Sequence, residues 1–179
     1  ALLSPDRGHH HLLIFRENAA EALPVDIAFP VLHGKNGEDG TIQGLIEMAG
    51  IPLAGCSVLS SALCMDKDRA HRLVAAAGVR VPRAMAASLT TPFLRISEFA
   101  KELGFPLFVK PVKAGSSYGV TRVTSDEGLR EAVKLAFLYD NEIIIEENIE
   151  GFEVGCSVLG CEELTVGAVD EIELSGGFF

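Results

Sequence analysis

The stretch FPLFVKPVKAGSSYG, residues 105–119, constrains the possible folds more than any other part of the chain. An apolar run from Pro106 to Val109 ends at Lys110, and a loop of small residues follows. Such a strand would hold the lysine ammonium in one place as a point charge. Glycines let backbone N–H groups approach an anion, and serine hydroxyls add donors. The stretch suits a polyphosphate, although a buried strand with a chance lysine and an ordinary surface loop explains it about equally well. It is not a Walker motif, because GxxxxGK[ST] is absent.

The composition excludes several classes of protein. Apolar residues make up 48% of the 179 residues, so we expect a globular chain of one or two domains. The formal net charge of −10 argues against nucleic acid as the main partner, and any anion site must be built from a few local cations. No apolar run approaches the roughly 20 residues that cross a membrane.

The spacing of the cysteines and histidines does not predict a metal site. The four cysteines form no CxxC pair, and no signal peptide precedes them, so we expect reduced thiols in a cytoplasmic protein. His9, His10 and His11 lie in a stretch rich in proline, glycine and aspartate. A solvated loop explains these histidines better than a metal site, because three adjacent side chains cannot all face one ion from a regular element.

Apolar runs alternate with amphipathic segments, which predicts an α/β fold. Apolar residues at positions 42, 45, 46 and 49 follow the spacing of a helix that Gly50 ends. The stretch from Pro106 to Val123 reads as a hairpin around the Gly/Ser loop. Other helices are expected over 57–65, 67–77, 96–103 and 129–137, and strands over 25–32, 51–55, 142–147, 153–159 and 164–174.

Two positions favour ligand contacts. His33 ends the predicted strand 25–32 beside a glycine-rich loop, where substrates often bind in α/β domains, although a simple loop hydrogen bond is equally plausible. Asp66 can cap a helix that has Lys67 in its first turn. A cation there opposes the helix dipole by on the order of a few tenths of a kcal/mol. Its position indicates an anionic ligand, while a plain surface lysine is the commoner explanation in general.

Four stretches in order resemble one family, the D-alanine–D-alanine ligases. They are LHGKNGEDGTIQG (32–44), CMDKDRAH (64–71), FPLFVKPVKAGSSYGV (105–120) and IIIEENIEGFEVG (143–155). These ligases are ATP-grasp enzymes of peptidoglycan precursor synthesis, a part of cell wall biogenesis that also maintains cell shape. The resemblance implies phosphorylation of the first D-alanine carboxylate by ATP, then attack on the acyl phosphate by a second D-amino acid. Gly55-Cys56 and GFEVGCSVLG (151–160) are similar to the vancomycin-resistance branch, which makes D-Ala–D-Ser or D-Ala–D-lactate and confers antibiotic resistance.

The resemblance also implies a partial ATP-grasp fold of the α/β (α+β) class. Residues 1–65 would be the remnant of an N-terminal Rossmann-like domain. Residues 66–148 would form the central ATP-grasp subdomain, and residues 149–179 the first strands of the C-terminal subdomain. The chain opens without a methionine at Ala1 and stops at Phe179 after a predicted strand. We therefore expect a piece of a longer protein that lacks both ends.

The resemblance assigns roles to nine residues. Lys110 and Lys67 match lysines that hold phosphates, and Ser116 and Ser117 match the loop that folds over them. Ser116 also matches a serine at the first-substrate site, and His33 matches a histidine at the amino-acid site that helps to set protonation of the nucleophile. The nucleotide's base and ribose are assigned to four further positions: Glu146, Glu147 and Ile149 beside adenine, and Glu153 at the ribose hydroxyls. A solvated strand end is the alternative for these carboxylates.

The resemblance places other functional groups outside the chain. The glutamate that binds the first D-alanine would precede Ala1, and the oxyanion arginine and the magnesium ligands would follow Phe179. The chain itself is assigned no metal ligand. We therefore expect that it makes no dipeptide alone. The resemblance also implies that the full-length enzyme is a homodimer.

Two alternatives remain open. One is another ATP-grasp carboxylate–amine ligase, against which HGKNGEDG argues, because that loop is tied to the D-alanine site. The other is a nucleotide-binding module without ligase activity. The residues that choose among D-Ala, D-Ser and D-lactate are expected mainly outside this sequence.

Overall fold

The structure, a computed structural model, describes residues 1–172. The chain divides into two compact units, Ala1–Glu147 and Asn148–Phe179, which are treated separately below. None of the helices in the described part of the chain is long and apolar enough to cross a membrane.

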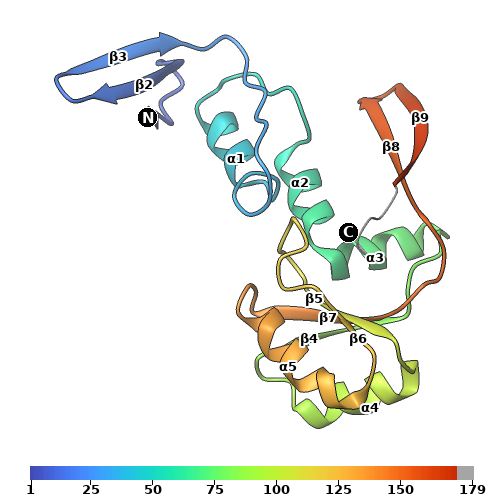
Figure 1. The fold of residues 1–179 in the computed structure, drawn as a ribbon. Coiled ribbons are helices and arrows are strands. Elements are labelled where there is room, and N and C mark those ends of the chain that lie inside the picture. Colours follow the sequence, from blue (N-terminus) through green and yellow to red (C-terminus); the bar gives the residue numbers. More distant parts are fainter. Residues whose placement is uncertain (173–179) are drawn as a thin grey trace. The chain divides into compact units, whose positions relative to one another are not determined.

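The centre of the first unit is a four-stranded antiparallel sheet with the order β4–β7–β5–β6 (Figure 1). Strand β5 lies between β6 and β7, and Leu107 pairs with Val123 and with Glu147. The predicted hairpin and the predicted strand over 142–147 are therefore confirmed. The strands are β4 (Ala84–Ser88), β5 (Leu107–Pro111), β6 (Thr121–Val123) and β7 (Glu142–Glu147).

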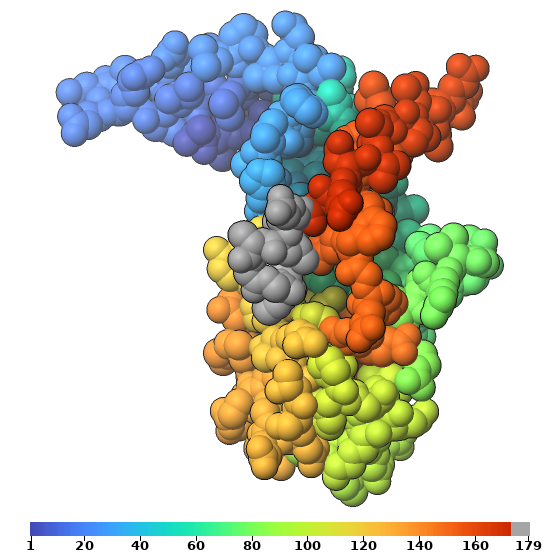
Figure 2. Space-filling view, turned by 45° about the vertical axis from the view of Figure 1, so that its right-hand side comes forward, coloured from blue at the N-terminus to red at the C-terminus, as the bar shows by residue number. Residues whose placement is uncertain are grey.

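Two helices, α4 (Phe93–Leu103) and α5 (Asp126–Phe137), pack against one face of this sheet and against each other (Figures 1 and 2). Because side chains alternate along a strand, Val109 and Ile145 point to the helices and are fully buried with Leu129 of α5. The opposite face carries the intervening residues, among them Lys110 and Glu146, and neither helix covers it. One face thus supplies the core and leaves the other available for a site.

Three further helices precede the sheet. They are α1 (Thr41–Met48), α2 (Val58–Met65) and α3 (Lys67–Ala76), all close to the expected bounds. Asp66 is buried between α2 and α3, and its carboxylate accepts a hydrogen bond from the Arg69 backbone N–H at 2.9 Å. This N-cap starts α3 at Lys67, as predicted.

The first 24 residues, which sequence patterns left largely unassigned, form a small antiparallel sheet. Its strands are β1 (Leu2–Leu3), β2 (His11–Arg16) and β3 (Ala19–Pro24). His9 and His10 are exposed in the preceding loop, where His9 Nδ1 lies 3.1 Å from Asp6 Oδ2. The predicted solvated loop is confirmed for these two histidines, while His11 begins β2.

The buried strand predicted over 25–32 and the short strand predicted over 51–55 are wrong, because neither segment forms a strand. The two segments share one isolated parallel bridge, between Ala28 and Leu53, and most apolar side chains of the first segment are exposed. An apolar run becomes a buried strand only when neighbouring strands and a covering layer exist. Among residues 1–172 the segment 25–32 has a single short neighbour.

The second unit contains a hairpin of β8 (Glu153–Gly160) and β9 (Leu164–Ile172). Both predicted strands are confirmed, and positions 173 and 174 of the second one lie outside the described residues. Nearly every side chain of this hairpin is exposed.

Candidate functional site

Lys110 and Glu146 form an ion pair on the sheet face that α4 and α5 leave uncovered. They lie on adjacent strands, and Lys110 Nζ is 2.6 Å from Glu146 Oε1. The Lys110 side chain is 27% exposed and the Glu146 side chain 3%. The ammonium also lies 5.1 Å from the centroid of the Phe108 ring. The strand therefore holds Lys110 as a fixed cation whose outer part still reaches solvent.

Lys67 comes to the same place from α3. Its Nζ donates hydrogen bonds to the carbonyls of Ala114, at 2.9 Å, and of Val112, at 3.4 Å. Burial and, next, repulsion from the Lys110 ammonium lower the pKa of Lys67, while attraction to Glu146 opposes this effect. The two cations are thus near enough to repel each other, although 43 residues separate them in the sequence.

This pair of lysines fits a polyphosphate. Two partly buried like charges destabilise each other, and an anion that touches both would remove that cost. Glu146, Asp140 and Asp66 attract Lys67, but the pKa of Lys67 is still lowered. The arrangement has the charge and the access that phosphate oxygens require.

The Gly/Ser loop lies next to the lysines and packs on the loop of His33. Gly115 permits this packing, since a Cβ there would lie 2.8 Å from Gly34 Cα. Ser116 and Ser117 have φ angles of 51° and 55°, a left-handed conformation that costs free energy in residues with a side chain. His33 and Ser116 line one cavity of ≈ 310 Å³, together with Lys35, Lys113, Tyr118 and Tyr139 among others. The structure therefore brings together both residues assigned to the amino-acid site.

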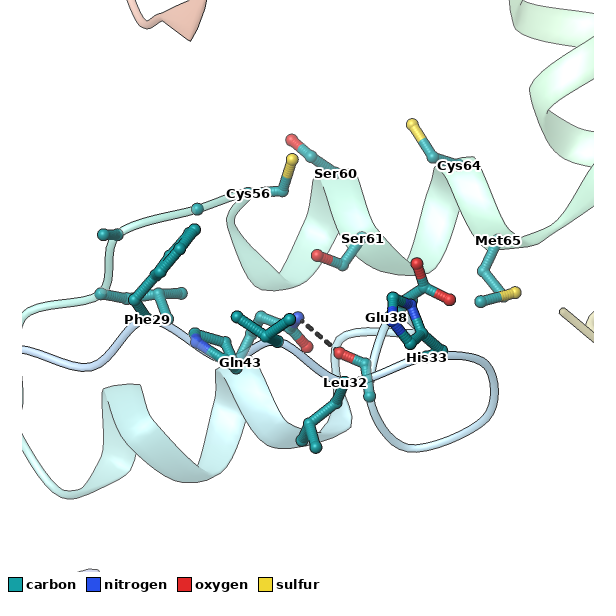
Figure 3. A pocket seen from close by; sticks show the side chains of 16 residues that line it. Phe29, Leu32, His33, Glu38, Gln43, Cys56, Ser60, Ser61, Cys64 and Met65 are labelled. Atoms are coloured by element: carbon teal, nitrogen blue, oxygen red, sulfur yellow. Dashed lines mark hydrogen bonds between the residues drawn. The ribbon is translucent and has the colours of Figure 1, made fainter. Parts of the chain in front are cut away.

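A second cavity of ≈ 470 Å³ lies on another side of His33, between residues 29–38, α1 and α2 (Figure 3). Ser61 and Met65 point from α2 toward the loop that carries His33 (Figure 3). Gln43 donates through Nε2 to Gly37 O at 3.0 Å, and its buried Oε1 has no hydrogen-bond partner among residues 1–172. The cavity is large enough for a small molecule, and Gln43 is among its lining residues.

The other residues predicted for the nucleotide site are Glu147, at the end of β7, and Ile149 and Glu153, which follow it in the chain. Glu147 accepts hydrogen bonds from the backbone N–H of Arg83 at 2.9 Å and from Arg83 Nε at 3.0 Å. The backbone bond first, and then the side-chain bond, keep the pKa of this carboxyl below its usual value. Ile149 and Glu153 are exposed and belong to the second unit.

Two groups near the loop were not predicted as site residues. Tyr139 stacks on Tyr118 of the Gly/Ser loop, and Asp140, the next residue of the same turn, bonds to Lys113 just before the loop. Lys113 follows Lys110 closely in the sequence, so its charge could have identified it as a candidate site residue. Nothing local in the sequence marks Tyr139, because its partner is 21 residues away.

Magnesium has no site in the part of the chain that the structure describes. Among residues 1–172, no group of three or more histidine, cysteine, aspartate or glutamate side chains is arranged to hold a metal ion.

Comparisons with known proteins agree on one family. Family models described as the N-terminus and the C-terminus of D-ala D-ala ligase match residues 4–56 and 73–179. The chain is 50% identical over 184 residues to the vancomycin B-type resistance protein VanB of Enterococcus faecalis, with 100% of this chain and 51% of that protein covered. It is 43% identical over 183 residues to a D-alanine–D-alanine ligase of Caldicellulosiruptor bescii, with 99% and 50% covered.

A solved structure is similar over the same region. The crystal structure of the VanG D-Ala:D-Ser ligase from Enterococcus faecalis superposes with a TM-score of 0.86 at 52% identity, with 99% of this chain and 51% of that chain covered. The chain spans about half the length of the relatives it matches. The predicted partial ligase fold is confirmed.

Proposed function

Because the chain belongs to the D-alanine–D-alanine ligase family, we propose that the protein joins D-alanine to a second D-amino acid at the expense of ATP. The product would serve peptidoglycan precursor synthesis in the cytoplasm. The observation that carries the proposal is the convergence of Lys67 and Lys110 at the sheet face opposite α4 and α5, next to a Gly/Ser loop. A strand that carried only a chance lysine would not require a second, half-buried lysine from another helix.

The two lysines hold the phosphates in this proposal. Lys110 is fixed by Glu146 and Lys67 by two backbone carbonyls, so neither ammonium must be ordered when a nucleotide binds. ATP supplies the phosphoryl group that activates the first substrate's carboxylate. The fixed charges neutralise negative charge that builds up during transfer. Ser116 and Ser117 add hydroxyl and backbone donors above the phosphates.

His33 acts at the amino-acid site. It shares a cavity with Ser116, so the loop over the phosphates and the imidazole face the same space. An imidazole can take up a proton near neutral pH, which suits a reaction in which an ammonium must become a nucleophilic amine. We assign His33 the role of setting the protonation state of the second substrate's amine.

The base and ribose are assigned to the end of β7 and the segment after it. Glu146, Glu147 and Ile149 line the adenine site, and Glu153 takes the ribose hydroxyls. Because the side chains of Glu146 and Glu147 are occupied by Lys110 and Arg83, backbone groups supply most hydrogen bonds to adenine. Residues 1–65, 66–148 and 149–179 correspond to the N-terminal, central and C-terminal parts of the family's architecture.

The second candidate is a ligase of the vancomycin-resistance type, which would use D-Ser or D-lactate as the second substrate. Two proteins of this type are more similar to the chain than the D-alanine–D-alanine ligase is: VanB and VanG are 50% and 52% identical, against 43%. In both candidates magnesium acts with ATP, the 179-residue chain alone forms no dipeptide, and the full-length enzyme is a homodimer.

The test is product analysis with the gene product at its natural length. The enzyme is given ATP, magnesium and D-Ala, with D-Ser and D-lactate in competition, and phosphate release is measured beside the products. Lys67→Met and Lys110→Met should each lower kcat/KM for ATP by about 100-fold. Lys134→Met, which removes an exposed lysine of α5, is the control and should change little. Activity unaffected by both site variants would contradict the proposal.

A further inference from the structure

One end of the Gly/Ser loop is held by Asp140, in the turn between α5 and β7. The Lys113 backbone N–H donates to Asp140 Oδ2 at 2.7 Å, and Lys113 Nζ lies 3.4 Å from Asp140 Oδ1. The Asp140 side chain is 9% exposed and also accepts a hydrogen bond from the Glu142 N–H at 3.3 Å. A buried carboxylate with two backbone donors and one ammonium is a fixed anchor.

The other end of the loop is held by the neighbouring residue, Tyr139. The rings of Tyr118 and Tyr139 stack, with centroids 6.0 Å apart and planes 30° apart. Gly119 lies directly against the same ring, since a Cβ there would come within 2.6 Å of Tyr139 Cδ2 and 2.9 Å of Pro111 Cγ. Gly119 also has a φ of 71°. A side chain at position 119 would therefore push the loop away from the tyrosine.

Between the two anchors lie Ser116 and Ser117, both in the left-handed conformation. Residues with side chains keep this conformation only where the surroundings impose it. The α5–β7 turn supplies contacts on both sides of the two serines, because Asp140 holds Lys113 before them and Tyr139 stacks on Tyr118 after them. Tyr139 and Asp140 also line cavities beside the loop, Tyr139 with Ser116 and both with Lys113.

We infer that Tyr139 and Asp140 are positioning residues for the phosphate loop: they set the place of Ser116 over the site. The inference rests on the proposed function, since it assigns the loop to the phosphates. It predicts that the α5–β7 turn controls how well the protein distinguishes a long phosphate chain from a short one. Adenine and the first phosphate would be bound without help from the loop.

The test compares three substitutions in the full-length gene product. Tyr139→Leu removes the ring and should increase amide hydrogen exchange of residues 114–119 in the free protein by roughly 3- to 10-fold, the factor that an aromatic pair supplies. The ratio of the Kd for ATP to the Kd for AMP should rise by a similar factor. Tyr139→Phe keeps the stacked ring and should restore both values. Leu138→Ala, at a neighbouring side chain that is 79% exposed, is the matched control and should change neither.

Tyr118→Leu gives the same test from the loop side. Tyr118 is exposed, so its loss does not threaten folding, and the double variant with Tyr139→Leu should be no worse than either single one. Unchanged loop exchange and an unchanged ATP to AMP ratio in Tyr139→Leu would overturn the inference. A wild-type protein that binds no ATP would instead overturn the proposed function, and the exchange of the free loop would still decide whether the turn positions it.

Discussion

The four-stranded sheet and the β8–β9 hairpin are built from similar residues but are buried very differently. In β7, the three isoleucines Ile143–Ile145 are at most 1% exposed. In β8 and β9, side chains of the same kind, such as Val158 and Val166, are mostly exposed. The difference is the covering layer: α4 and α5 cover one face of the sheet, and α3 lies over part of the other, where Ala84 and Ile144 line a cavity with His71.

This difference explains where the candidate site lies. Charged side chains can be held in a fixed geometry only on a scaffold that is itself fixed by packing. Lys110 and Glu146 stand on the sheet whose other face is the core, and their strands cannot shift without disturbing Val109 and Ile145. The hairpin offers exposed apolar side chains but no comparable support within residues 148–172.

The largest expected change in unfolding free energy comes from breaking a buried ion pair on the sheet, compared with an exposed ion pair elsewhere. Lys110→Met leaves the Glu146 carboxylate buried without its close cation and should cost about 3 kcal/mol of unfolding free energy. Arg16→Met breaks the exposed Arg16–Glu21 pair of the β2–β3 hairpin, where both side chains are largely solvated, and should cost about 0.5 kcal/mol or less. Urea unfolding followed by tyrosine fluorescence measures both. Equal costs would mean that the sheet face is as solvated as the hairpin.

The next largest change in unfolding free energy shows the effect of burial, because the same substitution, valine to alanine, is made at a buried and at an exposed site. Val109→Ala removes two carbons from a fully buried site and should cost about 2 kcal/mol, including the cavity that remains. Val166→Ala, at a site that is 64% exposed, should change the free energy by about 0.5 kcal/mol or less. Both tyrosines lie in the first unit, so their fluorescence follows the sheet. A Val166→Ala variant that moved this transition as much as Val109→Ala would show that the hairpin's side chains are buried after all.

The smallest effect is a pH dependence at the edge of the site. Hydrogen bonding from Lys113, helped by the nearby Arg69, holds the pKa of Glu142 below its usual 4.5. A lowered carboxyl pKa means that the stabilisation is complete above that value and is lost as the pH falls through the folded pKa. Unfolding free energy should therefore fall by up to about 1 kcal/mol between about pH 5 and pH 3, and by less in Glu142→Gln. Glu171→Gln, in β9, is the control and should show the full wild-type fall.

Some parts of the molecule were readable from short sequence patterns. The cap at Asp66, the spacing of apolar residues in α5 and the hairpin around residues 115–119 are local features, because the groups that determine them are a few residues apart. Lys67 was suspected because a cation at a helix start is unfavourable, and it does lie beside Lys110. The segment 25–32 shows the limit, since its apolar composition predicted burial that the structure does not have.

The sequence alone determined most helices and strands after residue 40, the family, and the lysines and serines that suit phosphates. These features can be predicted from the sequence because helix and strand propensity, capping and motif spacing depend on residues within one short segment. Only the tertiary structure decided which apolar strands are buried, that Glu146 pairs with Lys110, and that one turn holds both ends of the Gly/Ser loop. Those contacts join residues far apart in the chain, and their free energy depends on distance and exclusion of water, which no single segment specifies.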